Sequence, residues 1–153
     1  MYDISLVLTA VGQALLLAPS PTGIFVESCR DGTLYRLNLD DTGAGSRFAA
    51  AVVTAISLFF IAVLAGVRAA TALSLSAKPR LVIAAVQLVI AALLIAGVSW
   101  GSCAVGAGIY LQLAIFVSWV MAAVMTPSLP PQQETDKKTN KKRNIFMKTG
   151  LVY

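Results

Sequence analysis

Three long runs of apolar residues dominate the chain after residue 47. Residues 48–67, 81–100 and 105–125 contain no Asp, Glu, Lys, Arg or His. An α-helix rises about 1.5 Å per residue, so runs of this length cross a hydrocarbon core about 30 Å thick. The pattern therefore predicts three transmembrane helices.

A fourth apolar run, residues 4–18, is interrupted by Thr9 and Gln13 and followed by Pro19-Ser20-Pro21. Prolines end a helix because they lack an N–H donor and restrict the residue before them. The run is short, so two interpretations stay open: a cleaved signal peptide, or a first span over about residues 2–18 helped by local bilayer thinning. We favour the retained span, because nothing basic precedes the run.

The loop of residues 19–47 is the only sizeable segment between the apolar runs. Two stretches rich in β-branched and aromatic residues, 24–28 and 33–39, flank Asp31-Gly32 within it. An Asp-Gly pair between such stretches is typical of a hairpin turn, since glycine accepts a positive φ without steric cost. We therefore predict a small β-hairpin in this loop.

The remaining segments complete the expected organisation. Residues 76–80 are predicted to form a tight connector, and residues 126–153 are polar without apolar periodicity, which predicts a disordered basic tail. The expected fold class is an all-α membrane protein. Residues 1–125 would form a four-helix antiparallel transmembrane bundle with a small exoplasmic β-hairpin.

Basic residues are distributed unevenly between the two expected faces of the membrane. Nine of the twelve Lys and Arg residues lie in the tail or around the 76–80 connector, and three lie in the 19–47 loop. By the positive-inside rule, the tail and the connector are cytoplasmic. We expect an integral protein of the plasma membrane or the secretory pathway, with a cytoplasmic C-terminus.

Two cysteines, Cys29 and Cys103, fall in the two loops that this topology places outside the cell. Disulfides persist in that compartment, so a bridge between the loops is our prediction. The alternative is two free cysteines, because spacing alone does not establish the geometry.

The spans carry no residues suited to catalysis. The chain has no histidine, and no ionisable residue lies within the three charge-free runs, whereas intramembrane chemistry normally needs such groups. We expect no enzyme activity, no cofactor, no metal, no nucleic-acid partner and no small-molecule substrate. Gln13 and Gln112 lie at similar expected depths, about 7 and 10 Å beneath the outer face, and are candidates for an interhelical hydrogen bond.

Two further groups of residues are candidates for contacts. Small residues at a spacing of four let helices approach closely, either within the bundle or in a lateral oligomer, and the basic tail suits anionic lipid headgroups. The small-residue candidates are Ala62, Gly66, Ala70, Ala114, Ser118 and Ala122, and the lipid candidates are Lys137, Lys138, Lys141, Lys142 and Arg143.

The order of these elements resembles the claudin and peripheral-myelin-protein superfamily, which includes the amastin-like surface proteins. The local likenesses are residues 47–50, 77–100 and 106–111. The resemblance implies a tetraspan of the cell surface. Claudins, however, carry a Trp, a Gly-Leu-Trp motif and two cysteines in the first loop, whereas this loop has one cysteine and no Trp. A MARVEL-type tetraspan has the same topology.

We therefore expect a structural, membrane-organising or cell-surface contact role, with membrane lipids and other membrane proteins, including copies of this chain, as partners. The alternative is a small pore, or an accessory subunit of a channel or transporter, because helix bundles can form pores with backbone and amide groups alone.

Overall fold

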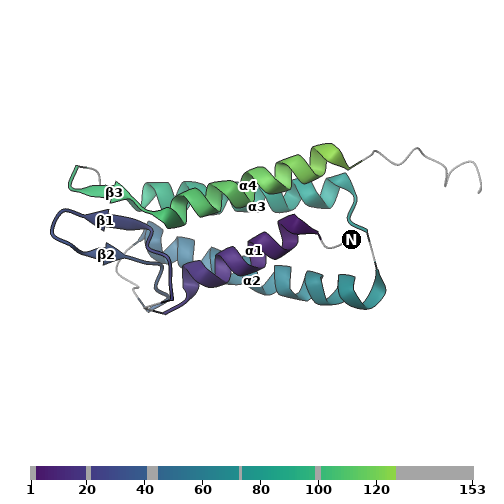
Figure 1. Cartoon of the computed structure of the whole chain (residues 1–153), viewed down its shortest axis with the longest axis horizontal. Coiled ribbons are helices and arrows are strands. Elements are labelled where there is room, and N and C mark those ends of the chain that lie inside the picture. Colours follow the sequence, from purple (N-terminus) through teal and green to yellow (C-terminus); the bar gives the residue numbers. More distant parts are fainter. Residues whose placement is uncertain (1–2, 20–21, 41–44, 73, 99–100, 127–153) are drawn as a thin grey trace, which may run out of the picture.

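The computed structural model describes residues 3–19, 22–40, 45–72, 74–98 and 101–126, and the predicted tail lies outside them. Within these residues the chain forms four helices and three short strands (Figure 1). The helices are α1 (Ile4–Leu17), α2 (Ser46–Thr71), α3 (Ala77–Ala96) and α4 (Ala107–Met125). They run alternately up and down, which confirms the predicted four-helix antiparallel bundle.

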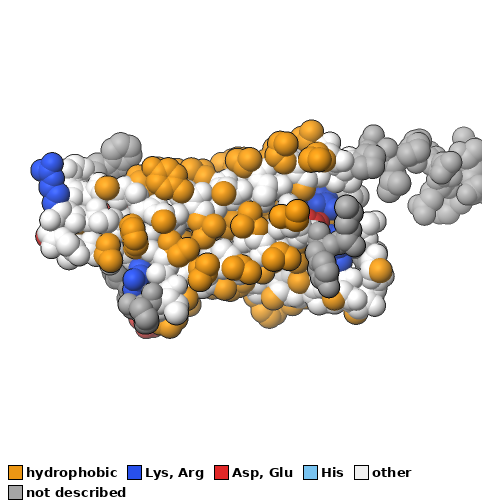
Figure 2. Space-filling view, in the orientation of Figure 1, with side chains coloured by type: hydrophobic (Ala, Val, Ile, Leu, Met, Phe, Trp, Pro, Cys, Tyr) orange, Lys and Arg blue, Asp and Glu red, His pale blue; other side chains and the backbone are white. Residues whose placement is uncertain are grey.

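Helices α2, α3 and α4 are long and apolar enough to cross a membrane, whereas α1 has only 14 residues. At 1.5 Å per residue α1 extends about 21 Å, less than a hydrocarbon core of about 30 Å. Hydrophobic side chains cover the middle of the bundle on the face shown in Figure 2, and charged side chains gather at its two ends. The protein is an integral membrane protein with several helices.

The helix boundaries differ from the sequence prediction at the connector between α2 and α3. The third helix begins at Ala77 rather than residue 81, so Lys78, Pro79 and Arg80 form its first turn. Proline is tolerated there because the first N–H groups of a helix have no intrahelical partner. We call the end of the bundle where α2 ends and α3 begins the connector end.

The three strands form one antiparallel sheet at the opposite end of the bundle, which we call the sheet end (Figure 1). The predicted hairpin is present as β1 (Glu27–Cys29) and β2 (Leu34–Tyr35). The sequence did not predict β3 (Cys103–Val105), which comes from the loop between α3 and α4 and makes the strand order β2-β1-β3. Because an isolated hairpin is marginally stable, this third strand is an important addition.

The hairpin turn is fixed by Asp31 and Gly32. Gly32 has φ +82°, and the Asp31 carboxylate accepts hydrogen bonds from the Thr33 hydroxyl at 2.6 Å and the Thr33 backbone N–H at 3.0 Å. These hydrogen bonds, that of the hydroxyl more than that of the N–H, hold the pKa of Asp31 below its ordinary value.

A pH dependence follows from this turn. Because the folded pKa of Asp31 is lowered, its stabilisation of the turn is present above the unfolded pKa of about 3.8 and is lost as the pH falls through the folded value. Replacing Thr33 with valine should raise the pKa of Asp31 towards its ordinary value. The carboxyl ¹³C shift of Asp31 followed against pH would measure this, and an unchanged midpoint in Thr33→Val would contradict it.

The interior of the bundle contains two apolar clusters. One lies near the sheet and includes Leu16, Ile90 and Ile109, and the other lies towards the connector end and includes Ile61, Ile115 and Trp119. Helices α1 and α4 pack closely because Gly12 and Gly108 have no side chains, and an added Cβ would lie 2.8 Å from a leucine or isoleucine methyl at either position. Polar side chains line the interior between these clusters.

Candidate functional site

The central polar site joins all four helices through the side chain of Gln87 in α3. Gln87 Oε1 accepts hydrogen bonds from Gln13 Nε2 of α1 at 2.7 Å and from Gln112 Nε2 of α4 at 2.9 Å. Gln87 Nε2 donates to the Ser57 hydroxyl of α2 at 3.0 Å. All three glutamines are fully buried. We call Gln13, Ser57, Gln87 and Gln112 the amide cluster.

One backbone carbonyl determines the orientation of every amide in this cluster. Gln112 Nε2 also donates to the backbone oxygen of Gln87 at 3.1 Å, and a carbonyl only accepts hydrogen bonds. The NH₂ group of Gln112 must therefore face Gln87, and the side-chain oxygen of Gln87 must face Gln112. The NH₂ group of Gln13 follows, because it meets that same oxygen.

This orientation leaves two buried oxygens of the cluster, Gln13 Oε1 and Gln112 Oε1, without a hydrogen-bond partner among the described residues. The buried hydroxyl of Thr54, three residues before Ser57 on α2, also has none there. An unpartnered buried polar group costs about 1–3 kcal/mol, so the cluster is only partly satisfied by the chain itself.

The predicted candidates Gln13 and Gln112 both form interhelical hydrogen bonds, but each donates to Gln87 rather than to the other. The sequence analysis did not select Gln87. Its signal was an amide within an otherwise uncharged and apolar span, which is costly in a membrane unless it has a partner.

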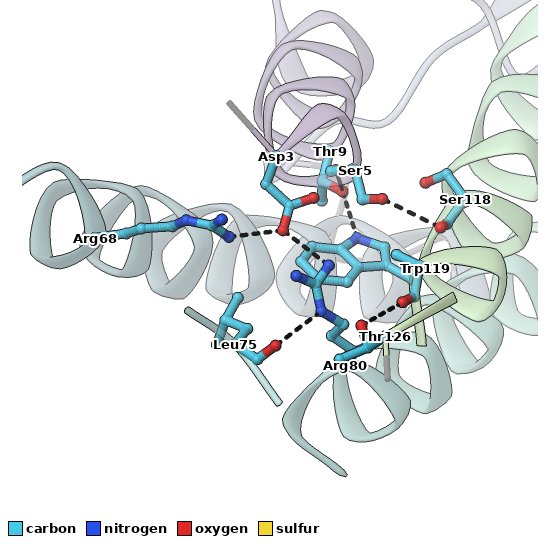
Figure 3. Close-up of polar contacts among 10 residues, drawn as sticks. Asp3, Ser5, Thr9, Arg68, Leu75, Arg80, Ser118, Trp119 and Thr126 are labelled. Carbon is cyan, nitrogen blue, oxygen red and sulfur yellow. Dashed lines mark hydrogen bonds and ion pairs between the residues drawn. The ribbon is translucent and has the colours of Figure 1, made fainter. Parts of the chain in front are cut away.

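A second polar layer lies between the amide cluster and the connector end. Trp119 Nε1 donates to the Thr9 hydroxyl at 2.6 Å, and the Ser5 hydroxyl donates to the backbone oxygen of Ser118 at 3.1 Å (Figure 3). Ser5, Thr9 and Gln13 are spaced four residues apart, which places them on one face of α1. That spacing was the sequence signal for the face of α1 that enters the bundle.

An ion-pair cluster closes the connector end. One oxygen of Asp3, Oδ2, lies 2.7 Å from an Arg68 nitrogen and 2.8 Å from an Arg80 nitrogen, and Arg80 Nε also donates to the Leu75 carbonyl at 3.1 Å (Figure 3). Asp3 is almost fully buried here, with 7% of its side chain exposed. The cluster ties the start of α1 to the end of α2 and the beginning of α3.

These contacts bear on whether the first helix is kept. Without residues 1–18, Arg68 and Arg80 would lose their carboxylate, Trp119 its acceptor and Gln87 one of its donors. We therefore predict that the mature protein retains α1. Intact-mass measurement of protein purified from membranes should match a chain that includes α1, and a mass that corresponds to loss of these residues would contradict the prediction.

A second charged group joins the sheet to the bundle at the sheet end. Arg47, in the first turn of α2, forms an ion pair with Glu27 of β1, donates from Nε to the Gly97 carbonyl at 3.0 Å, and stacks over the Tyr35 ring at 4.3 Å. Glu27 is fully buried. The backbone adds to this joint, because the N–H groups of Gly106 and Gly108 donate to the carbonyls of Val26 and Phe25.

The predicted disulfide is present: Cys29 and Cys103 are opposite each other in β1 and β3 and are bonded. Within the described residues, the one cluster of potential metal ligands is Glu27, Cys29 and Cys103. It does not suit a metal, since both sulfurs are in the disulfide and Glu27 is paired with Arg47.

Removing the disulfide should destabilise the fold by about 1–3 kcal/mol. This is less than the 74-residue separation of the cysteines suggests, because the spans stay helical in the membrane after the bundle opens and the unfolded chain therefore has less entropy for the disulfide to remove. Cys29→Ser and Cys103→Ser should give equal losses of unfolding free energy in bicelles, and the double variant should lose no more. Unequal or additive losses would show that the cysteines act separately.

The small-residue candidates lie mainly away from the interior of the bundle. Ala62, Gly66, Ala70 and Ala114 are exposed, and Ser118 and Ala122 are half-buried. Packing within the bundle, the first of the two alternatives, does not hold for the α2 residues, because the buried face of α2 contains Ala50, Ala51, Thr54, Ser57 and Ile61 instead. The second alternative, a lateral oligomer, stays a prediction. The tail candidates Lys137, Lys138, Lys141, Lys142 and Arg143 lie outside the described residues.

Comparisons with known proteins give no relative. No family model matches the chain, no curated protein matches it, and no solved structure matches it. The fold and the site define a four-helix membrane bundle with a disulfide-bonded three-stranded sheet at one end.

Proposed function

We propose that this protein is a non-catalytic, membrane-organising tetraspan that makes contacts with other membrane proteins through its sheet. The observation that carries the proposal is the rigid attachment of this sheet to the bundle by the disulfide, the Glu27–Arg47 ion pair and the Gly97 contact. The sheet and the segment after it expose apolar side chains, with Leu34 52%, Tyr35 37% and Leu39 47% exposed. Exposed apolar side chains on a sheet held in place outside the membrane are suited to protein contact.

A non-catalytic role is supported by the chemistry of the interior. The polar groups at membrane depth in the described helices are amides, hydroxyls and an indole, and these do not titrate near neutral pH. The carboxylates of Asp3 and Glu27 are held at the ends of the bundle by arginines. The interior therefore favours helix association over proton transfer.

The finer proposal is a claudin-like or amastin-like surface protein of the plasma membrane or the secretory pathway, with the sheet exoplasmic. Supporting it are the order of elements and a disulfide, which persists in an oxidising compartment. The chain differs from claudins in that Cys29 pairs with a cysteine of the second loop.

Cysteine labelling tests this orientation, because the two native cysteines are bonded and should not react. Arg30→Cys should react with an impermeant maleimide on intact cells, and Lys78→Cys should react only after permeabilisation.

The contact role is tested by photo-crosslinking in cells. A photoreactive amino acid at Leu34 should give discrete protein adducts, whereas the same group at Val63, which is 49% exposed on α2 within the spanning region, should give mainly lipid adducts. Leu39→Ser should reduce the Leu34 adducts, and Val105→Ser on the other edge strand should not. Protein adducts equally frequent at Leu34 and Val63 would contradict a contact role specific to the sheet.

A second candidate, a small pore or an accessory subunit of a channel or transporter, is favoured by the three unpartnered polar atoms of Gln13, Thr54 and Gln112. Such atoms inside a bundle can face permeating water or ions. In planar bilayers, this candidate requires a conductance that Gln112→Leu changes. Absence of conductance for purified protein that retains its folded signal would remove the pore form of the candidate.

A further inference from the structure

The ion-pair cluster at the connector end carries more positive than negative charge. Arg68 and Arg80 share one oxygen of Asp3, and the exposed Lys78 lies two residues before Arg80. Among the described residues at this end, three cations therefore lie with a single carboxylate, and two of them are paired with it. A surplus of two positive charges remains, which attracts an anion.

The length of α2 places this cluster at the surface of the hydrocarbon core. Arg47 and Arg68 are the charged residues of that helix and are 21 positions apart. At 1.5 Å per residue the two arginines are separated by about 32 Å along the helix, close to the core thickness of about 30 Å. When Arg47 lies at one membrane surface, Arg68 and its partners lie at the other, at the depth of the lipid headgroups.

Both arginines have donors left for an anion. Each guanidinium carries five N–H groups, and the contacts within the described residues use one nitrogen of Arg68 and two of Arg80. No nitrogen of either residue is both buried and unpartnered, so the remaining donors reach the surface. The first turn of α3 is also there, without a side-chain cap from Ser76, and its N-terminal end is partly positive.

The neighbouring side chains point to a lipid rather than to a free anion. Leu81 is 54% exposed, Val82 65% and Val67 46%. Val67 directly precedes Arg68, and Leu81 and Val82 directly follow Arg80. These apolar side chains belong to the spanning helices, whose exposed residues face acyl chains when the helices cross a membrane. An anion bound to the arginines would therefore be next to hydrocarbon.

We propose that Arg68 and Arg80, with the charge of Lys78 in the first turn of α3, form a binding site for the headgroup phosphate of one anionic phospholipid. The phosphate accepts hydrogen bonds from the guanidinium donors that Asp3 does not use, and the acyl chains lie along the exposed apolar residues of α2 and α3. The site is separate from the basic tail. The bound lipid would bridge α2 and α3 at this end, beside the Asp3 carboxylate that the two arginines share.

The test uses the full chain with Lys137, Lys138, Lys141 and Lys142 replaced by glutamine, so that the tail does not mask the site. Native mass spectrometry from a neutral detergent would measure the affinity for phosphatidylglycerol and for phosphatidylcholine with the same acyl chains. We expect tighter binding of phosphatidylglycerol. Lys78→Gln should weaken that binding about fivefold, as expected for the loss of one cation close to an anionic lipid headgroup.

Two further variants separate a site from general charge. Arg30→Gln removes one exposed cation at the sheet end and should leave the affinity unchanged. Asp3→Asn removes the competing carboxylate and should strengthen phosphatidylglycerol binding about fivefold, although it loosens the contact of α1 with α2 and α3. A merely structural ion cluster predicts no gain in lipid affinity from that change.

The proposal is overturned if the two lipids bind equally, or if Lys78→Gln and Arg30→Gln have the same effect. Millimolar inorganic phosphate distinguishes the two sources of phosphate. Phosphate that displaces phosphatidylglycerol completely would show that the acyl chains contribute nothing and that the site takes free phosphate instead. Retention of the lipid in phosphate would support the lipid site.

Discussion

Replacing Arg47 with methionine is expected to destabilise the protein by about 3–5 kcal/mol, the usual cost of removing one partner of a buried ion pair. The carboxylate of Glu27 has 1% of its side chain exposed and would lose the ion pair that compensates its burial. The change also removes the hydrogen bond to Gly97 and the stacking on Tyr35. The loss should be concentrated at the joint between the sheet and the bundle.

Hydrogen exchange would measure this effect. The β1 amides should exchange faster in the variant, and the exchange rates in the middle of α3 should change less. Arg47→Lys keeps the charge but loses the planar group, so its effect should be intermediate. The double variant Glu27→Gln with Arg47→Met should recover part of the stability, because it removes the unpaired charge. If the double variant is no more stable than Arg47→Met alone, buried charge is not the cause.

Replacing Gln87 with leucine is expected to cost about 2–4 kcal/mol, because three interhelical contacts depend on this side chain. Gln13 and Gln112 would lose their shared acceptor and Ser57 its donor. A single hydrogen bond in a membrane protein contributes only about 0.6–2 kcal/mol. The larger effect comes from leaving amide groups buried without partners.

Unfolding in bicelles by added dodecyl sulfate, followed by the fluorescence of the buried Trp119, would measure this loss. Ser57→Ala removes a single contact and should cost less than Gln87→Leu. The triple variant with leucine at positions 13, 87 and 112 removes every amide of the cluster and should be more stable than Gln87→Leu alone. Additive losses across the three positions would contradict a network centred on Gln87.

The membrane class and the helices were predictable because each span must by itself be long enough and apolar enough to cross the hydrocarbon core. Residues 48–67, 81–100 and 105–125 were predicted from length and absence of charge, and helices occupy most of each. The connector was placed too late, since Lys78, Pro79 and Arg80 look like loop residues although the first turn of a helix tolerates them. The Asp31-Gly32 turn was predictable because a positive φ at Gly32 is a local requirement.

The candidate site was predicted only in part, because partners depend on how the helices are rotated about their axes. Gln13 and Gln112 were selected by depth, but depth does not reveal that Gln87 lies between them. The α2 small residues Ala62, Gly66 and Ala70 had a suitable spacing and are nevertheless exposed. Spacing defines a face of a helix, and only packing determines what that face meets.

The sequence by itself determined that this chain crosses a membrane with several helices, because the free energy of burying apolar residues and of excluding charge from lipid is a property of each segment. It also indicated where a hairpin turns and which cysteines can meet. The tertiary structure alone decided that β3 joins the hairpin, that Gln87 connects the four helices, and that Asp3 is shared by Arg68 and Arg80. Those contacts join residues far apart in the chain, and they exist only when all four helices have assembled in one register.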